Sequence, residues 1–139
     1  MTHNTNIDSN SNTSFLNPLS FLRLEALAWF IATLGLYHYF QGSWWVFAAL
    51  FFTPDISIVA YMYDSEKGAF FYNIFHTELV PLILIGYSFL FPAPLLLQIG
   101  IIWLSHINFD RILGIGLKYS DNFKHTHLGF ISFDKQSKN

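Results

Sequence analysis

Among the acidic and imidazole side chains within the long apolar stretches of this sequence, five could form a site together: Glu25, Asp55, His76, His106 and Asp110. A carboxylate near the centre of a bilayer costs about 2.5 to 3.5 kcal/mol on insertion scales, so such residues usually face one another inside a bundle. Carboxylates and imidazoles together can act as general acid and base or hold a metal ion. The five residues therefore predict a polar catalytic or binding site.

Spacing indicates which of these side chains can meet. His106 and Asp110 are four residues apart and share a helix face, and so do Asn73 and His76, three apart. His76 and Glu78 are two apart and point to nearly opposite faces, so the HTE stretch is not a two-ligand motif. The sequence contains no cysteine, HExxH motif or HxxxH pair. It therefore leaves open whether a metal is bound.

The alternative to a reactive pocket is a hydrogen-bonded network that fixes the register of neighbouring helices. We favour the pocket because two prolines shape the helices around it. Pro54 directly precedes Asp55 and frees the carbonyl of Leu50, whereas Pro81 frees the carbonyl of Thr77, next to His76. Broken helices at membrane depth often line binding sites.

The composition indicates lipid as the main solvent of the chain. Of 139 residues, 53% are hydrophobic, 19% are aromatic and only 12% are charged, about half the charged share of a soluble domain. The formal net charge of -2 gives no reason to expect nucleic acid as a partner. A glycine-rich phosphate loop and a dinucleotide fingerprint are also missing from the sequence.

Four stretches are long and apolar enough to cross a bilayer: 21–40, 43–63, 68–90 and 93–113. The connectors QGS, DSEKG and FPAP are short and rich in turn formers, so neighbouring helices should be antiparallel. The prediction is an all-α integral membrane four-helix bundle with up-down topology. Residues 1–20 are predicted to be a disordered cytoplasmic tail, 21–113 the transmembrane domain and 114–139 a cytoplasmic tail.

The distribution of charge predicts the orientation in the membrane. All seven lysines and arginines fall on the side shared by both termini and the middle loop. By the positive-inside rule both termini are cytoplasmic, and we expect a multi-pass protein of the bacterial inner membrane. Tyr37, Tyr39, Trp44 and Trp45 would then form an aromatic belt at the outer interface.

Counting residues places the polar side chains at one depth. Asp55, His76 and His106 would each lie roughly 10 to 13 Å inside the cytoplasmic leaflet, with Glu25 and Asp110 about a turn from that surface. The polar site is therefore predicted to open toward the cytoplasm.

The segment after the fourth stretch is too polar to span. Lys118 and Lys124 are expected to meet anionic lipid head groups, and so is Arg111. His125 and His127 lie on the same side of an extended chain and could bind a metal, but an exposed imidazole pair more often has no such role.

Five motifs can now be put together: LRLEALAW, PDIS, YNIFHT, HINFDRILGIGLKY and FKHTHLG. With them the chain resembles a family of small bacterial four-span integral membrane proteins catalogued as a domain of unknown function. The resemblance covers about residues 21–131 and implies bacterial origin, four spans and one domain. It implies no reaction, although Glu25, Asp55, His76, His106, Asp110 and Arg111 all fall in its motifs.

The expected activity is hydrolysis or proton transfer on a lipid-like or small apolar substrate, with a histidine as general base. One alternative is a proton or cation conduit, although the outer halves of the four stretches contain no ionisable residue apart from His38. Another is an assembly subunit whose polar layer docks a second membrane protein. The sequence specifies neither a cofactor nor an oligomeric state.

Overall fold

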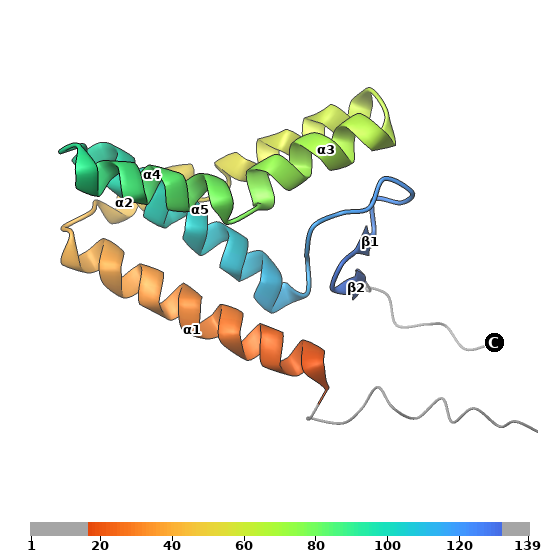
Figure 1. Cartoon of the computed structure of the whole chain (residues 1–139), viewed down its shortest axis with the longest axis horizontal. Coiled ribbons are helices and arrows are strands. Elements are labelled where there is room, and N and C mark those ends of the chain that lie inside the picture. The colour runs from red at the N-terminus through yellow and green to blue at the C-terminus, as the bar shows by residue number, and fades with distance from the viewer. Residues whose placement is uncertain (1–16, 132–139) are drawn as a thin grey trace, which may run out of the picture.

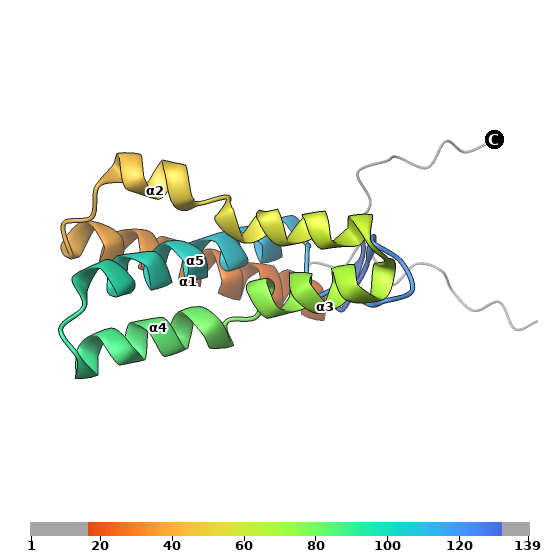
Figure 2. The same cartoon turned by 90° about the horizontal axis from the view of Figure 1, so that it is seen from above.

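The computed structural model describes residues 17–131, so most of the predicted N-terminal tail at 1–20 lies outside the described residues. In chain order the elements are α1 (Pro18–Tyr39), α2 (Trp44–Leu50), the 3-10 helix η1 (Thr53–Met62), α3 (Ser65–His76), α4 (Leu79–Leu90), α5 (Pro94–Leu113), β1 (His125–Thr126) and β2 (Gly129–Phe130). The predicted all-α bundle is confirmed. The helical segments run back and forth along one axis (Figures 1 and 2).

Three segments are long and apolar enough to cross a membrane: Pro18–Tyr39, Trp44–Met62 and Ser65–Leu90. Much of their large apolar surface is exposed, as expected for side chains that face lipid. The chain is thus a small helical membrane protein.

Helix α5 covers the fourth predicted stretch and forms the interior of the bundle. Ten of its 20 residues are buried, and α1 and α4 pack against it. This is the helix that carries His106, Asn108 and Asp110, so its polar side chains contact protein rather than lipid. Helix α5 is not among the three segments that are apolar enough to cross a membrane, and it carries these polar residues.

The second and third predicted stretches are each divided by a break just before the proline. Helix α2 ends at Leu50, and Pro54 stands in the first turn of η1, where it has no N–H to donate to the Leu50 carbonyl. The hydroxyl of Thr53 donates to that carbonyl instead, at 2.7 Å. The break places Asp55 in the first turn of η1.

The second break separates α3 from α4. Thr77 is extended, with φ -84° and ψ 141°, four residues before Pro81, whose ring would clash with the Thr77 carbonyl in a continuous helix. His76 is consequently the last residue of α3, and its side chain is buried. The pair α3 and η1 packs together, so Asp55 and His76 come from neighbouring elements.

After α5 the chain folds back over the bundle. Gly114 ends the helix in the left-handed region at φ 82°, a conformation that glycine adopts without strain. Strands β1 and β2 then pair antiparallel, and Figure 1 shows this hairpin between α3 and the first turns of α1. Asn73 on α3 binds the backbone of Lys118 twice, with its amide donating at 2.9 Å and its oxygen accepting at 2.7 Å.

Candidate functional site

Four of the five predicted site residues lie together, and we name them the His/Asp cluster: Asp55, His76, His106 and Asp110. The Nε2 atom of His76 lies 3.3 Å from Asp55 Oδ1 and 3.5 Å from Asp110 Oδ2. The Nε2 atom of His106 lies 3.4 Å from Asp55 Oδ1 and 3.7 Å from Asp110 Oδ2. The two Nε2 atoms are 3.4 Å apart.

The cluster is assembled from three elements. Asp55 comes from η1, His76 from the end of α3, and the other two residues from one face of α5. The side chains of His76 and His106 are only 3% and 1% exposed, and that of Asp110 is 12% exposed. Asp55 is 35% exposed, so it is the member through which the cluster is reached from outside.

Tyr72 holds His76 in place, and the sequence interpretation missed this residue. The backbone carbonyl of Tyr72 lies 2.9 Å from Nδ1 of His76. Because a carbonyl only accepts, Nδ1 carries a proton, and Nε2 faces the carboxylates. The Tyr72 hydroxyl also donates to Asp110 Oδ2 at 3.4 Å. The spacing of four residues between Tyr72 and His76 could have indicated the contact.

Lys118 is the second residue that was missed at the site, and its predicted contact with lipid head groups is wrong. The residue is 5% exposed, and its Nζ atom lies 4.2 Å from the ring centroid of Tyr72 and 3.1 Å from that of Phe123. Two hydrogen bonds between the Asn73 side chain and the Lys118 backbone hold Lys118 against the bundle. Burial lowers the pKa of Lys118 to about 8, because the charged form loses solvation.

An apolar pocket of about 390 Å³ adjoins the cluster. Asp55, His106 and Asp110 line one side of it, together with Lys118, and the rest of its wall is mainly hydrophobic, including Phe109. Concave apolar sites with a few convergent polar groups are typical of small-molecule binding. The polar groups here are those of the His/Asp cluster, which can act on a bound molecule by proton transfer or through a metal ion.

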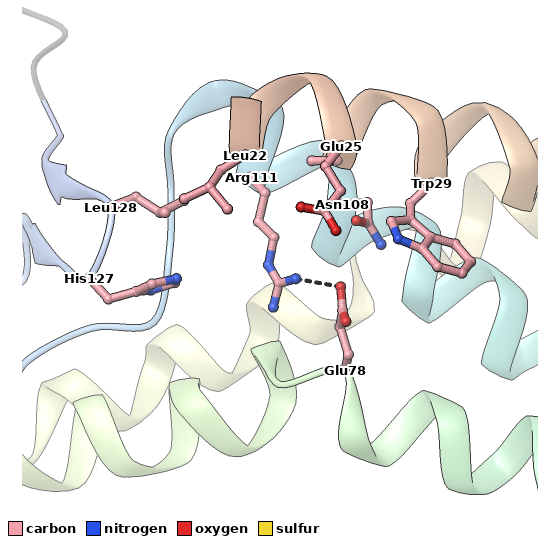
Figure 3. Close-up of a pocket in the computed structure, with 9 residues that line it drawn as sticks. Leu22, Glu25, Trp29, Glu78, Asn108, Arg111, His127 and Leu128 are labelled. Atoms are coloured by element: carbon pink, nitrogen blue, oxygen red, sulfur yellow. Dashed lines mark hydrogen bonds and ion pairs between the residues drawn. The ribbon is translucent and has the colours of Figure 1, made fainter. Parts of the chain in front are cut away.

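Glu25 does not join the cluster. Figure 3 shows it in a second pocket, of about 180 Å³, that also contains Asn108 and an ion pair between Arg111 and Glu78. Asn108 and Arg111 lie on a different face of α5 from His106. Arg111, which was expected to reach lipid head groups, therefore pairs with Glu78 across the helix interface.

A family model, Domain of unknown function (DUF4260), matches residues 19–131. The chain belongs to this family. The match extends from α1 to β2 and includes all four residues of the His/Asp cluster. No curated protein and no solved structure matches the chain significantly.

His125 and His127, the two histidines of the hairpin, both lie within the DUF4260 match. Each of them contacts a different part of the chain. Nδ1 of His125 lies 2.8 Å from an Asp121 carboxylate oxygen, and this hydrogen bond lowers the pKa of Asp121. Nδ1 of His127 accepts a hydrogen bond from the backbone N–H of Leu117 at 2.8 Å. Both δ nitrogens are therefore occupied by contacts that shape the hairpin.

Proposed function

We propose that this member of the DUF4260 family is a membrane-embedded enzyme that acts on a lipid-like or small apolar substrate. Its reactive centre is the His/Asp cluster. The observation that carries the proposal is the position of the cluster in the wall of the apolar pocket. A network that only fixed helix register would gain nothing from an adjoining pocket of about 390 Å³.

The pocket suits a molecule with an apolar body. Hydrocarbon would contact Phe109 and the other hydrophobic wall residues, while His106 and Asp55 face the same space. His106 is the general base in this proposal, because its side chain lines the pocket and that of His76 does not. The carboxylates orient the imidazoles, as in other acid and base sites.

Lys118 is placed to stabilise negative charge. It lines the pocket beside the cluster, in a buried position where a cation acts more strongly than it does in water. When water attacks the carbonyl carbon of an ester or amide, negative charge develops on the carbonyl oxygen. We therefore assign the Lys118 ammonium group to that oxygen.

We further propose that the site opens to the cytoplasmic leaflet of the bacterial inner membrane, with both termini cytoplasmic. Support comes from the basic residues: Arg23 near the start of α1, Lys67 near the start of α3 and Arg111 near the end of α5. In Figures 1 and 2 these three helix ends lie toward the same half of the bundle, away from α2. Lysine and arginine are retained on the cytoplasmic side.

A proton or cation conduit finds less support. Beyond His106 the bundle is filled by a hydrophobic core that includes Tyr37, Phe51, Leu97 and Ile101. An ion path needs polar groups across the whole bilayer. In residues 17–131 the buried acids and imidazoles are confined to the His/Asp cluster.

The proposal is tested with the full chain purified into nanodiscs of bacterial phospholipid. Lipid turnover and co-purified small molecules are measured by mass spectrometry for the native protein, His106→Gln and Asp55→Asn. His38→Gln is the matched control, because His38 is exposed at the end of α1. We expect product or bound ligand with the native protein and with His38→Gln, and loss of both in the two cluster variants without a change in thermal midpoint. Unfolding of the cluster variants, with no turnover by the native protein, would instead indicate a structural network.

A further inference from the structure

We infer that Asp55, His76, His106 and Asp110 bind one divalent transition-metal ion of the zinc type. The inference rests on the proposed function in that it gives the same cluster a cofactor, and it replaces His106 as the general base, because an Nε2 lone pair that binds a metal cannot take up a proton. Its test is a binding measurement, so it can succeed or fail independently of any reaction.

The spacing of the ligand atoms fits a tetrahedral ion. Zinc binds imidazole nitrogen and carboxylate oxygen at about 2.0 to 2.2 Å, so the ligand atoms of a tetrahedral site are about 3.3 to 3.6 Å apart. Five of the six separations among the two Nε2 atoms, Asp55 Oδ1 and Asp110 Oδ2 are 3.3, 3.4, 3.4, 3.5 and 3.7 Å. The four atoms all lie within 4.8 Å of one another.

The same distances are long for a network held by protons. A charge-assisted hydrogen bond between a nitrogen and a carboxylate closes to about 2.7 to 2.9 Å. Nε2 of His76 instead has three neighbours between 3.3 and 3.5 Å. A single proton on this Nε2 atom can form a good hydrogen bond to only one of the three neighbours, whereas a metal ion at the centre can contact all of them.

The direction of the lone pairs leads to the same conclusion. Nδ1 of His76 is committed as a donor to the Tyr72 carbonyl, which leaves Nε2 of the neutral ring as an acceptor. This lone pair points toward two carboxylate oxygens and a second Nε2 atom. The two carboxylate oxygens and Nε2 of His76 therefore converge as three acceptors, and a cation between them removes their mutual repulsion.

The charges also balance. Two carboxylates carry -2 and the ion carries +2, so the loaded site is neutral, and neutrality is favoured at membrane depth. The cluster also lacks sulfur, and imidazole with carboxylate suits zinc and related divalent ions. Such an ion, when bound, would polarise a substrate oxygen or activate a water molecule.

The outer contacts of His76 and Asp110 resemble those of a metal site. A histidine ligand usually donates its second N–H to a carbonyl or carboxylate, and ligating carboxylates are themselves hydrogen-bonded. His76 makes the first contact, to the Tyr72 carbonyl, and Asp110 makes the second, to the Tyr72 hydroxyl. Asp55 faces the apolar pocket, so the ion would be reached from the side where the substrate binds.

The inference is tested on the purified full chain in detergent. Elemental analysis is performed first, and Zn²⁺ and Co²⁺ are then titrated into chelator-treated protein by calorimetry and visible absorption. We expect one ion per chain and the intense Co²⁺ bands of a tetrahedral site. His76→Ala and His106→Ala should each weaken Zn²⁺ binding at least 100-fold, while His38→Ala and His125→Ala should bind as the native protein does.

Asp55→Asn is the variant to use where an imidazole variant fails to fold, because Asp55 is the most exposed ligand. It should bind Zn²⁺ about 10- to 100-fold more weakly, with an unchanged circular dichroism spectrum. Stoichiometric binding that survives in Asp55→Asn and in a folded His76→Ala/His106→Ala double variant would overturn the inference, and so would the absence of binding by the native protein. Lipid turnover by a native protein that binds no Zn²⁺ would overturn the metal site alone, whereas bound metal without turnover would count only against the enzyme.

Discussion

The ring of Tyr72 stacks on the imidazole of His76, with centroids 3.7 Å apart and planes 10° apart. The same residue accepts a hydrogen bond from His76 Nδ1 through its carbonyl and donates its hydroxyl to Asp110. One side chain therefore positions cluster residues on both α3 and α5. The hydrogen bond to the Tyr72 carbonyl does not depend on the Tyr72 side chain. Substitutions at this position can therefore separate the contributions of the ring and of the hydroxyl.

Tyr72→Phe should keep the stack and lose the hydroxyl, whereas Tyr72→Leu should lose both. Removal of an outer contact of a ligand typically lowers metal affinity about 10- to 100-fold. We expect Tyr72→Phe near the lower end of that range and Tyr72→Leu near the upper end, with the thermal midpoint of unfolding lowered mainly in Tyr72→Leu. Equal Zn²⁺ affinity in calorimetry for all three proteins would show that Tyr72 does not position the cluster.

Asn73 should control the docking of the hairpin. Asn73→Ala removes two hydrogen bonds to the Lys118 backbone, each with a net contribution of about 1 kcal/mol. Hydrogen exchange should become faster in residues 115–131 and remain slow in α5. Asn122→Ala is the matched control, because Asn122 is exposed and its side chain accepts only a local hydrogen bond, from Lys124 N–H. Unchanged exchange in Asn73→Ala would mean that other contacts dock the hairpin.

Depth in the bundle could be predicted from the sequence, because every helical residue adds about 1.5 Å. The layer shared by Asp55, His76 and His106 follows from this count, and the pairing of His106 with Asp110 follows from their spacing of four residues. Both proline breaks were also predictable, since each removes a specific hydrogen bond. These features depend on local chain geometry alone.

Rotation of a helix about its axis could not be predicted in the same way. Helix α1 carries apolar side chains on all its faces, so no apolar stripe indicates which face packs against the bundle. Glu25 was therefore assigned to the cluster by its depth alone. The burial of Lys118 was missed because it depends on Asn73, which is 45 residues away in sequence. Contacts over such a distance follow from how the whole chain packs.

Lys118 should make stability depend on pH in the alkaline range. Its pKa is about 8 in the folded protein, lowered by burial from the usual 10.5. Below about pH 8 the ammonium is charged in both the folded and unfolded states, and the folded state bears the cost of burying it. Between about pH 8 and 10.5 the folded state loses the proton first, so this residue makes the protein more stable as pH rises.

Lys118→Met removes the titrating group and keeps an apolar stem of similar length. The thermal midpoint of Lys118→Met relative to the native protein should be highest near pH 7 and should fall as pH rises from 8 to 10.5. Lys67→Met is the control, because Lys67 is exposed and contacts Asp64 at the surface. A constant difference between Lys118→Met and the native protein across this range would contradict the burial of the charge.

The ion pair between Arg111 and Glu78 should couple α5 to the break between α3 and α4. Both side chains are partly exposed, at 28% and 32%, so we expect a coupling free energy of about 1 kcal/mol. The measurement is a double-mutant cycle with Arg111→Gln and Glu78→Gln, read from unfolding in detergent. The exposed pair of Lys67 and Asp64 provides the comparison and should give a few tenths of a kcal/mol. A larger value for the exposed pair would rule out this ranking.

Gly100 should be required for the close approach of α4 and α5. A Cβ atom at this position would lie 2.8 Å from Ile85 Cγ1 and 3.1 Å from the Pro81 carbonyl oxygen, and small residues let membrane helices approach each other in this way. Gly100→Ala should therefore destabilise the protein by about 1 to 3 kcal/mol, the usual cost of overpacking. Gly86→Ala on α4 is the matched control, because nothing lies within 4 Å of its added Cβ. Both substitutions raise the helix propensity by the same amount, so the difference between their thermal midpoints reports on the contact between α4 and α5. Equal thermal midpoints would show that the two helices can move apart without a loss of stability.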